Sequence, residues 1–290
     1  MKAAAECLPA AAEWAVPAAR AAPAVVADPM RPVRPEFVPD PDTTREEMEA
    51  LQMEVATAAT WTDDFGFAVE SVAATDRSLT TPDSDPPLVA GVDQAFLGDR
   101  AVSVVVVSRG GTVVERAHAV TDLAIPYVPG LLAFREGGPI LAAFAELDCD
   151  PTLVVFDGSG RIHFRQAGLA THIGVTLDVP SVGVAKGLLC GTPDEGVDGR
   201  EEGWRTPIRA DADVENAAPG TVIGHAFQSR QYDSDPKINP LYVSPGHRVG
   251  VGTATDLVAR LCDGYKLPEP TRRADAYADE VKREYDADTA

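Results

Sequence analysis

Lysine is scarce in this 290-residue chain. Only 5 of its 25 basic residues are lysines, and they face 45 Asp and Glu residues, which gives a formal net charge of −20. A surface this acidic repels polyanions in dilute buffer, but concentrated salt screens the repulsion within a few ångströms. The composition therefore predicts a halophilic protein of a salt-rich cytoplasm.

Cysteines and long apolar runs are also scarce. The four cysteines form no CxxC pair, so neither a zinc site nor a disulfide framework is indicated. No apolar run reaches the roughly 20 residues that cross a bilayer, so we expect no membrane association. Residues 1–29 are rich in alanine and proline, and Glu6, Glu13 and Arg20 interrupt every apolar core that a signal peptide would need. We expect a disordered extension there, and a monomer.

Residues 30–87 are predicted to form an N-terminal helix and linker that pack on the main body. The letters TTREE at 43–47 offer a capping box, which satisfies free N–H groups at a helix start. Apolar residues then recur on one helical face: Met48, Leu51, Val55 and Ala59.

The body, residues 88–290, opens with three β-rich runs separated by glycine turns: LVAGVDQAF, AVSVVVVS and TVVERAHAV. A helical stretch at 126–147 follows, in which Pro139 is predicted to open a second helix. TLVVFDG, GLATHIGVTL and PSVGVAKG then alternate strand, helix and strand. The predicted fold is α/β: a mixed sheet with a three-stranded antiparallel meander, then βαβ units, and flanking helices.

Three carboxylates stand where packing does not explain them. Asp93 lies inside a strand, Glu136 lies on an otherwise apolar helix face, and Asp157 ends a buried strand. A buried charge without a partner costs on the order of several kcal/mol. Taken singly, each acid could cap a turn or pair with an arginine, although Arg135 is expected to point elsewhere. Together they offer the oxygen ligands that Mg²⁺ or Mn²⁺ prefers.

This order of elements resembles the ribonuclease H-like nuclease fold, and the sequence from Leu88 to Thr253 resembles the endonuclease V family. Five blocks in the family's order carry the resemblance: VAGVD at 89–93, PYVPGLLAFREG at 126–137, DGSGRIHFRQAGLATHIGV at 157–175, PSVGVAKG at 180–187 and PLYVSPGHR at 240–248.

The resemblance implies a metal-dependent repair endonuclease for deaminated bases. It would cut DNA containing deoxyinosine (hypoxanthine) at the second phosphodiester bond on the 3′ side of the lesion, leaving 5′-phosphate and 3′-hydroxyl ends. Asp93, Glu136 and Asp157 would hold Mg²⁺, with Mn²⁺ able to substitute. His163 would move protons or position water, and Lys186 would hold a phosphate oxygen; alternatively, His163 hydrogen-bonds a loop and Lys186 pairs with Asp157.

Lesion recognition requires the base to leave the helical stack. In PYVP, each residue before a proline is pushed toward extended geometry, so Tyr127 is presented on a stiff loop and could fill the gap left by a flipped base. Its alternative role is a core aromatic.

The remaining candidate substrate-binding residues are glycines, a leucine and two histidines. Glycine lets the backbone approach a base edge, although turn geometry and a tight strand crossing are alternative roles. By resemblance, the base pocket comprises Gly158, Gly160, Gly183 and Leu189, and His172 and His247 either support the site or contact substrate.

The chain departs from the family pattern after Asp93, where Gln94, Ala95 and Phe96 replace a small-residue and tyrosine pattern. Its acidity is a second departure, since nucleases usually bind the DNA backbone through released counterions. We expect short-range DNA contacts from three arginines: Arg161, Arg165 and Arg248.

Two other functions stay open: the three carboxylates alone do not exclude the first, whereas their intact set argues against the second. One is a related ribonuclease H-fold nuclease that acts on inosine-containing RNA or RNA–DNA hybrids. The other is a non-catalytic nucleic-acid binder.

Overall fold

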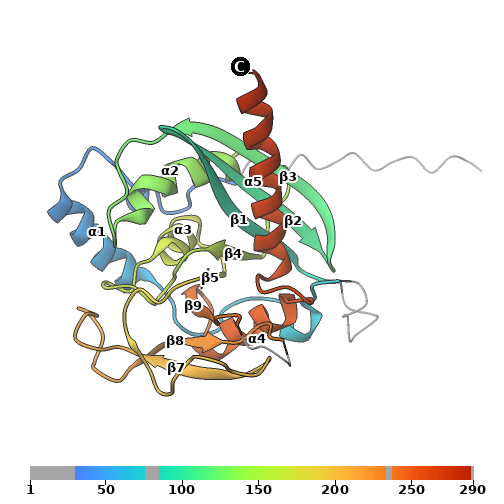
Figure 1. Cartoon of the computed structure of the whole chain (residues 1–290). Coiled ribbons are helices and arrows are strands. Elements are labelled where there is room, and N and C mark those ends of the chain that lie inside the picture. The colour runs from blue at the N-terminus through green and yellow to red at the C-terminus, as the bar shows by residue number, and fades with distance from the viewer. Residues whose placement is uncertain (1–29, 76–84, 233–236, 289–290) are drawn as a thin grey trace, which may run out of the picture.

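A single mixed sheet organises the residues that the computed structural model describes, 30–75, 85–232 and 237–288 (Figure 1). Its nine strands lie in the order β3-β2-β1-β4-β5-β9-β8-β7-β6. In that order their bounds are Thr112–Asp122, Arg100–Arg109, Leu88–Leu97, Leu153–Asp157, Ser181–Ala185, Leu241–His247, Val222–Phe227, Arg205–Arg209 and Thr192–Pro193.

The centre of the sheet matches the predicted α/β architecture. β1 pairs with β2, and β2 with β3, in an antiparallel meander. β1 is parallel to β4, and β4 is parallel to β5. Because Val92 pairs with Phe156, the next residues along these two strands, Asp93 and Asp157, leave the pairing side by side.

Helices cover both faces of the sheet. On one face, α2 (Leu132–Phe144) and α3 (Leu169–Leu177) bury apolar residues of β1, β2 and β4 in one core. On the other face, α4 (Val251–Leu261) packs on β4, β5 and β9, and α5 (Glu269–Asp288) packs on β2. None of the described helices is both long and apolar enough to cross a membrane.

The prediction that Pro139 opens a second helix is wrong, because α2 runs through it without a break. A proline inside a helix removes one hydrogen bond and costs about 3 kcal/mol. Ile140 and Phe144 beyond it are fully buried, and burying two such side chains recovers a comparable amount. Tertiary packing therefore outweighs the local signal.

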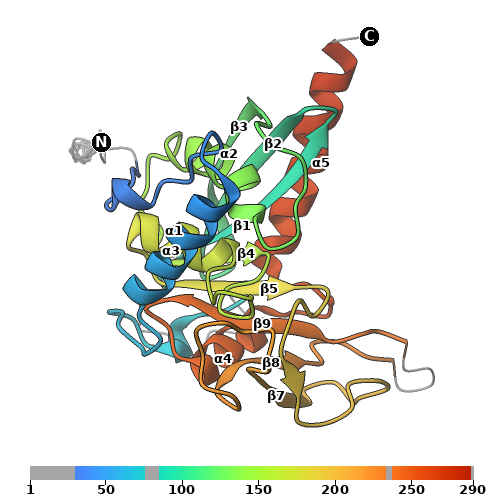
Figure 2. The same cartoon turned by 90° about the vertical axis from the view of Figure 1, so that its left-hand side faces the viewer.

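The N-terminal segment comprises η1 (Pro35–Phe37), α1 (Arg45–Ala58) and η2 (Val69–Ser71). The predicted capping box is present: the Glu47 N–H donates to Thr44 Oγ1, and the Thr44 N–H donates to Glu47 Oε2. α1 lies against α3 through a shared apolar cluster (Figure 2). The predicted extension at 1–29, and the linker at 76–84, lie outside the described residues.

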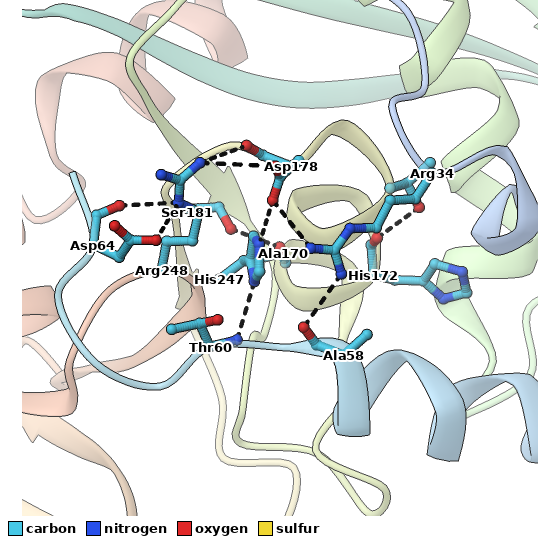
Figure 3. A network of polar contacts seen from close by, with 11 residues as sticks. Arg34, Ala58, Thr60, Asp64, Ala170, His172, Asp178, Ser181, His247 and Arg248 are labelled. Atoms are coloured by element: carbon cyan, nitrogen blue, oxygen red, sulfur yellow. Dashed lines mark hydrogen bonds and ion pairs between the residues drawn. The ribbon is translucent and has the colours of Figure 1, made fainter. Parts of the chain in front are cut away.

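A network of ion pairs holds this segment to the body (Figure 3). Asp178, the C-cap of α3, adopts a left-handed φ of 51°. Its carboxylate contacts Arg34 at 3.4 Å, His247 at 3.0 Å and Arg248 at 3.8 Å. Arg248 also binds Asp64 at 3.1 Å. One carboxylate therefore joins the N-terminal segment, α3 and the end of β9.

Candidate active site

The three predicted carboxylates line one pocket. Asp93 comes from β1, Glu136 from α2 and Asp157 from the end of β4, around a volume of about 190 Å³. Strand pairing fixes the two aspartates beside each other, and the apolar face of α2 directs Glu136 toward them. The fold thus brings together acids that are 64 residues apart in sequence, from position 93 to position 157.

Burial makes negative charge unfavourable in this pocket. Burial, together with the nearby charge of Asp157, raises the pKa of Asp93 to about 7. Burial also raises the pKa of Glu136 to about 7, although Arg135 opposes the shift. When burial raises the pKa of a carboxyl group, a positive charge that enters the pocket stabilises its ionised form.

Two side-chain cations already meet these acids. Lys186, just after β5, donates to Asp157 Oδ2 at 2.6 Å, as one of the alternatives considered for it predicts. Arg135 Nη1 donates to Glu136 Oε1 at 3.1 Å and lies over the Phe96 ring, so the expectation that it points elsewhere is wrong. Within the described part of the chain, no three His, Cys, Asp or Glu side chains are already arranged to hold a metal ion.

The donor set nevertheless fits a hard divalent cation. Mg²⁺ keeps several waters and is usually held by one or two carboxylates together with substrate phosphates, so it does not require a preformed three-ligand cage. Asp93, Glu136 and Asp157 supply only oxygen atoms to one pocket, and two of them have raised pKa values. These are the residues present that would hold it.

A fourth acid, Asp275 of α5, was missed in the sequence. Its charge raises the pKa values of both Asp93 and Lys186, so it lies within electrostatic reach of the pocket. α5 reaches β1 because Gly91 has no Cβ where the Pro270 backbone passes. Asp275 follows Ala274, which docks the helix on the sheet, and that position next to a core residue is the only local signal for it.

A second pocket, of about 180 Å³, adjoins the first, with Leu169 in the walls of both. Tyr127, Gly158, His163 and Leu189 line it. Tyr127 is 64% exposed, so it is not a core aromatic. An unburied aromatic ring therefore stands at the rim of a pocket next to the carboxylates.

His163 lies in this second pocket and not among the carboxylates. It is 3% exposed, and burial together with the Arg165 charge lowers its pKa to about 3. Its Nδ1 accepts from the Arg165 N–H at 3.2 Å, so Nε2 carries the proton and donates to the Gly130 carbonyl at 3.1 Å. The ring is neutral and both nitrogens are engaged.

Gly160 and Gly183 lie behind the pocket wall. A Cβ on Gly183 would come within 2.6 Å of the Gly158 carbonyl oxygen, and one on Gly160 would meet the Pro245 carbonyl. Both glycines allow the loop after β4 to cross β5 and β9 at backbone contact. Of the three predicted pocket glycines, only Gly158 lines the pocket itself.

Comparison with known proteins decides the family. The family model for endonuclease V matches residues 70–276, most of the chain. The chain belongs to the endonuclease V family.

Endonuclease V of the haloarchaeon Haloarcula marismortui is 60% identical over 265 residues, which cover 87% of this chain and 98% of that protein. The crystal structure of endonuclease V from Streptomyces avermitilis has a TM-score of 0.67 at 32% identity, covering 89% of this chain and 99% of that one. Endonuclease V of Ciona intestinalis, solved in complex with DNA containing an inosine followed by a ribo-adenosine, has a TM-score of 0.62 at 24% identity, covering 83% and 98%. The chain is thus an endonuclease by family, and its predicted fold is confirmed.

Neither His172 nor His247 lines either of the two pockets described above. His172 is fully buried, donates from Nε2 to the Phe37 carbonyl at 2.8 Å and packs edge-on against Phe134. His247 pairs with Ser181 at the start of β5, whereas Lys186 follows the end of that strand, roughly 16 Å away at 3.3 Å per residue. Its ring binds Asp178 and the Thr60 N–H (Figure 3). Both rings instead fasten the N-terminal segment.

The predicted DNA-contacting arginines differ in their surroundings. Arg165 is 6% exposed and is bound to Gln52 and Glu215, so for this residue the prediction is wrong. Arg161 stacks over the Trp61 ring at 4.8 Å, and Arg248 binds Asp64. The arginines that were expected to contact DNA thus make ion pairs or ring contacts within the protein.

Proposed function

We propose that this protein is a metal-dependent DNA repair endonuclease that recognises deoxyinosine and hydrolyses the second phosphodiester bond on its 3′ side. The products would carry 5′-phosphate and 3′-hydroxyl ends. One observation carries the proposal: a pocket lined by three carboxylates shares a wall, Leu169, with a pocket that has an exposed tyrosine at its rim. Chemistry and base recognition would then occur at neighbouring places on one strand.

The carboxylates would bind the cation. Mg²⁺ or Mn²⁺, when bound, lowers the pKa of water and neutralises charge on a phosphate. Asp93, Glu136 and Asp157 would orient it, and the raised pKa values of Asp93 and Glu136 favour an incoming positive charge. Glu136 would exchange its bond to Arg135 for this role.

Lys186 would hold a phosphate oxygen. Burial lowers its pKa, but the hydrogen bond and the charge of Asp157 outweigh that effect and raise it, so the side chain stays an ammonium ion. The Lys186 side chain is half exposed, which leaves it free to swing from Asp157 to substrate. His163, neutral and fully bonded, would shape the base pocket, and its predicted proton transfer stays a prediction.

The second pocket would receive the flipped base. Hypoxanthine differs from adenine and guanine at edges that pairing hides, so reading it requires extrusion. Tyr127 would stack in the gap, a contact worth roughly 1–3 kcal/mol per base. Gly158 and Leu189 would form walls of the pocket. The inosine in the Ciona intestinalis complex supports this choice of ligand.

The test uses matched oligonucleotides with one central deoxyinosine, riboinosine or adenine, and an RNA–DNA hybrid. Purified protein is incubated with each, with Mg²⁺, with Mn²⁺ or with a chelator, and the nick is mapped to the nucleotide. We expect one nick, two phosphodiester bonds 3′ of deoxyinosine, that requires the cation and disappears in Asp157→Asn. Cutting restricted to riboinosine or to the hybrid would favour the RNA alternative. Tight inosine binding without any nick would favour a non-catalytic binder.

We also propose that the enzyme works in concentrated salt. The net charge of −20 supports this, as does the similarity to endonuclease V of Haloarcula marismortui. Screening would remove the repulsion between the acidic surface and DNA, and binding would rest on the cation, Tyr127 and the base pocket. Cleavage should persist across a KCl series up to molar concentrations; a sharp loss at high KCl would contradict the proposal.

A further inference from the structure

Gln52 is a fully buried amide on α1, a helix whose other buried residues are apolar. Both ends of its side chain are bonded. Its Nε2 donates to the Gly130 carbonyl at 2.8 Å, and its Oε1 accepts from Arg165 Nε at 2.8 Å. Gln52 also lines the second pocket, together with Gly130 and Tyr127. This side chain therefore links the N-terminal helix to the place proposed for the base.

The two partners of Gln52 are joined to each other through His163. The Gly130 carbonyl also accepts from His163 Nε2, and the Arg165 N–H donates to His163 Nδ1. Gln52, Gly130, His163 and Arg165 thus form a closed ring of hydrogen bonds, which we call the Gln52 ring. Acidic side chains hold Arg165 from outside it, Glu49 at 3.6 Å and Glu215 at 2.9 Å.

Gly130 gives the Gln52 ring its reach. It has a φ of +82° and lies three residues after Tyr127 and two before the start of α2, which carries Glu136. Fixing its carbonyl fixes the end of the Tyr127 loop relative to both pockets. Only a side chain that donates at one end and accepts at the other satisfies Gly130 and Arg165 together, and glutamine does so.

We propose that Gln52 is a positioning residue for lesion recognition, which holds the Tyr127 loop at the rim of the base pocket through Gly130. The proposal rests on the proposed function. Apolar residues of α1 supply its docking: Met48 and Leu51 pack on Leu131 and Phe134, and Val55 packs on α3. Docking therefore does not require a buried amide at position 52.

Two substitutions separate the two bonds. Gln52→Met keeps the length of the side chain and removes both, whereas Gln52→Glu keeps an acceptor for Arg165 and loses the donor to Gly130. Glu54→Gln, on the exposed side of the same helix, is the matched control. Affinity for deoxyinosine and undamaged strands is measured together with KM and kcat for cleavage. The fluorescence of 2-aminopurine beside the lesion reports unstacking of the base.

Both Gln52 variants should weaken preference for the deoxyinosine strand by up to about tenfold, the range that one lost hydrogen bond spans. The change should appear in KM and in the 2-aminopurine signal, with kcat nearly unchanged, and Glu54→Gln should match wild type. The decisive arm repeats Gln52→Met in a Tyr127→Ala background. If Gln52 acts through Tyr127, the second substitution adds nothing there.

A loss that is equally large in the Tyr127→Ala background would overturn the inference, as would unchanged preference in Gln52→Glu. If Gln52→Met does not fold, Gln52→Glu in both backgrounds supplies the same comparison. A wild-type protein without any preference for deoxyinosine would instead defeat the proposed function. A wild-type preference that neither Gln52 variant alters defeats only the role of Gln52.

Discussion

Replacing the buried His172 should change how stability depends on pH. Burial lowers its pKa from the usual value near 6.5 to about 4, so on acidification the unfolded chain takes up this proton before the folded protein does. The neutral, buried ring therefore contributes stability at pH values above the pKa that His172 has in the unfolded chain. This contribution is lost as pH falls toward the lower pKa that His172 has in the folded protein. At pH 5.5, one unit below the unfolded value, the loss is about 1.4 kcal/mol. It depends little on the folded pKa, provided that value lies well below 5.5.

The wild-type profile alone does not isolate this loss. His163, with a pKa lowered to about 3, contributes a similar loss. Asp93 and Glu136 act in the opposite direction: their pKa values are raised to about 7, so the folded protein takes up those protons first and gains stability as pH falls. The gain and the loss are of the same order, so the slope of wild-type stability against pH does not report on His172 by itself.

The His172→Gln variant removes one histidine from this balance. Glutamine keeps an N–H donor for the Phe37 carbonyl but does not titrate. Unfolding free energies come from urea titrations followed by tryptophan fluorescence at pH 8 and pH 5.5, in constant KCl with a chelator. Relative to wild type, His172→Gln should gain about 1.4 kcal/mol between the two pH values. A difference that stays constant within about 0.3 kcal/mol would refute a neutral, buried His172.

Three further substitutions follow from the packing and the charges. Gly183→Ala should cost at least about 1–3 kcal/mol in chemical denaturation, because its Cβ would lie 2.6 Å from the Gly158 carbonyl oxygen; an unchanged midpoint would contradict that contact. Asp178→Asn keeps a residue that tolerates a left-handed φ but removes the charge that faces two arginines and a histidine. It should lower the free energy of unfolding by about 1–2 kcal/mol, and by less in high KCl. Equal losses at all salt concentrations would argue against an ionic origin. Asp275→Asn should raise the Mg²⁺ concentration for half-maximal cleavage by about tenfold at unchanged thermal stability, and an unaltered Mg²⁺ titration would remove this acid from the site.

Local signals predicted the carboxylate pocket well. Strand pattern and helix periodicity place Asp93, Glu136 and Asp157 on buried faces, and a buried acid without a nearby partner in sequence is conspicuous. The capping box at Thr44 was readable for the same reason, because both of its members lie within four residues. What sequence spacing did not reveal was that Arg135, adjacent to Glu136, turns back to bind it.

The histidines and Gln52 show where sequence reasoning stops. His172 and His247 stand in blocks that resemble the family, yet their partners Phe37 and Asp178 lie 135 and 69 residues away. Gln52 lies on an amphipathic helix, where an amide is normally exposed, and its partner Gly130 is 78 residues distant. Long-range partners decide these roles, and no local pattern encodes them. The prediction for Pro139 was wrong for a related reason, because the residues after it are buried by tertiary packing.

The stretch between α1 and η2, which contains Asp63, has a consequence for synthesis on the ribosome. Asp63 accepts the Gly250 N–H at 2.7 Å and the Thr253 hydroxyl at 2.6 Å, and so holds the start of α4 across 187 residues of chain. At about 5–20 residues per second, synthesis of α4 follows that of Asp63 by about 10–40 seconds. In a nascent chain the contact between Asp63 and α4 therefore forms late, after α3, on which α1 packs, has already been made.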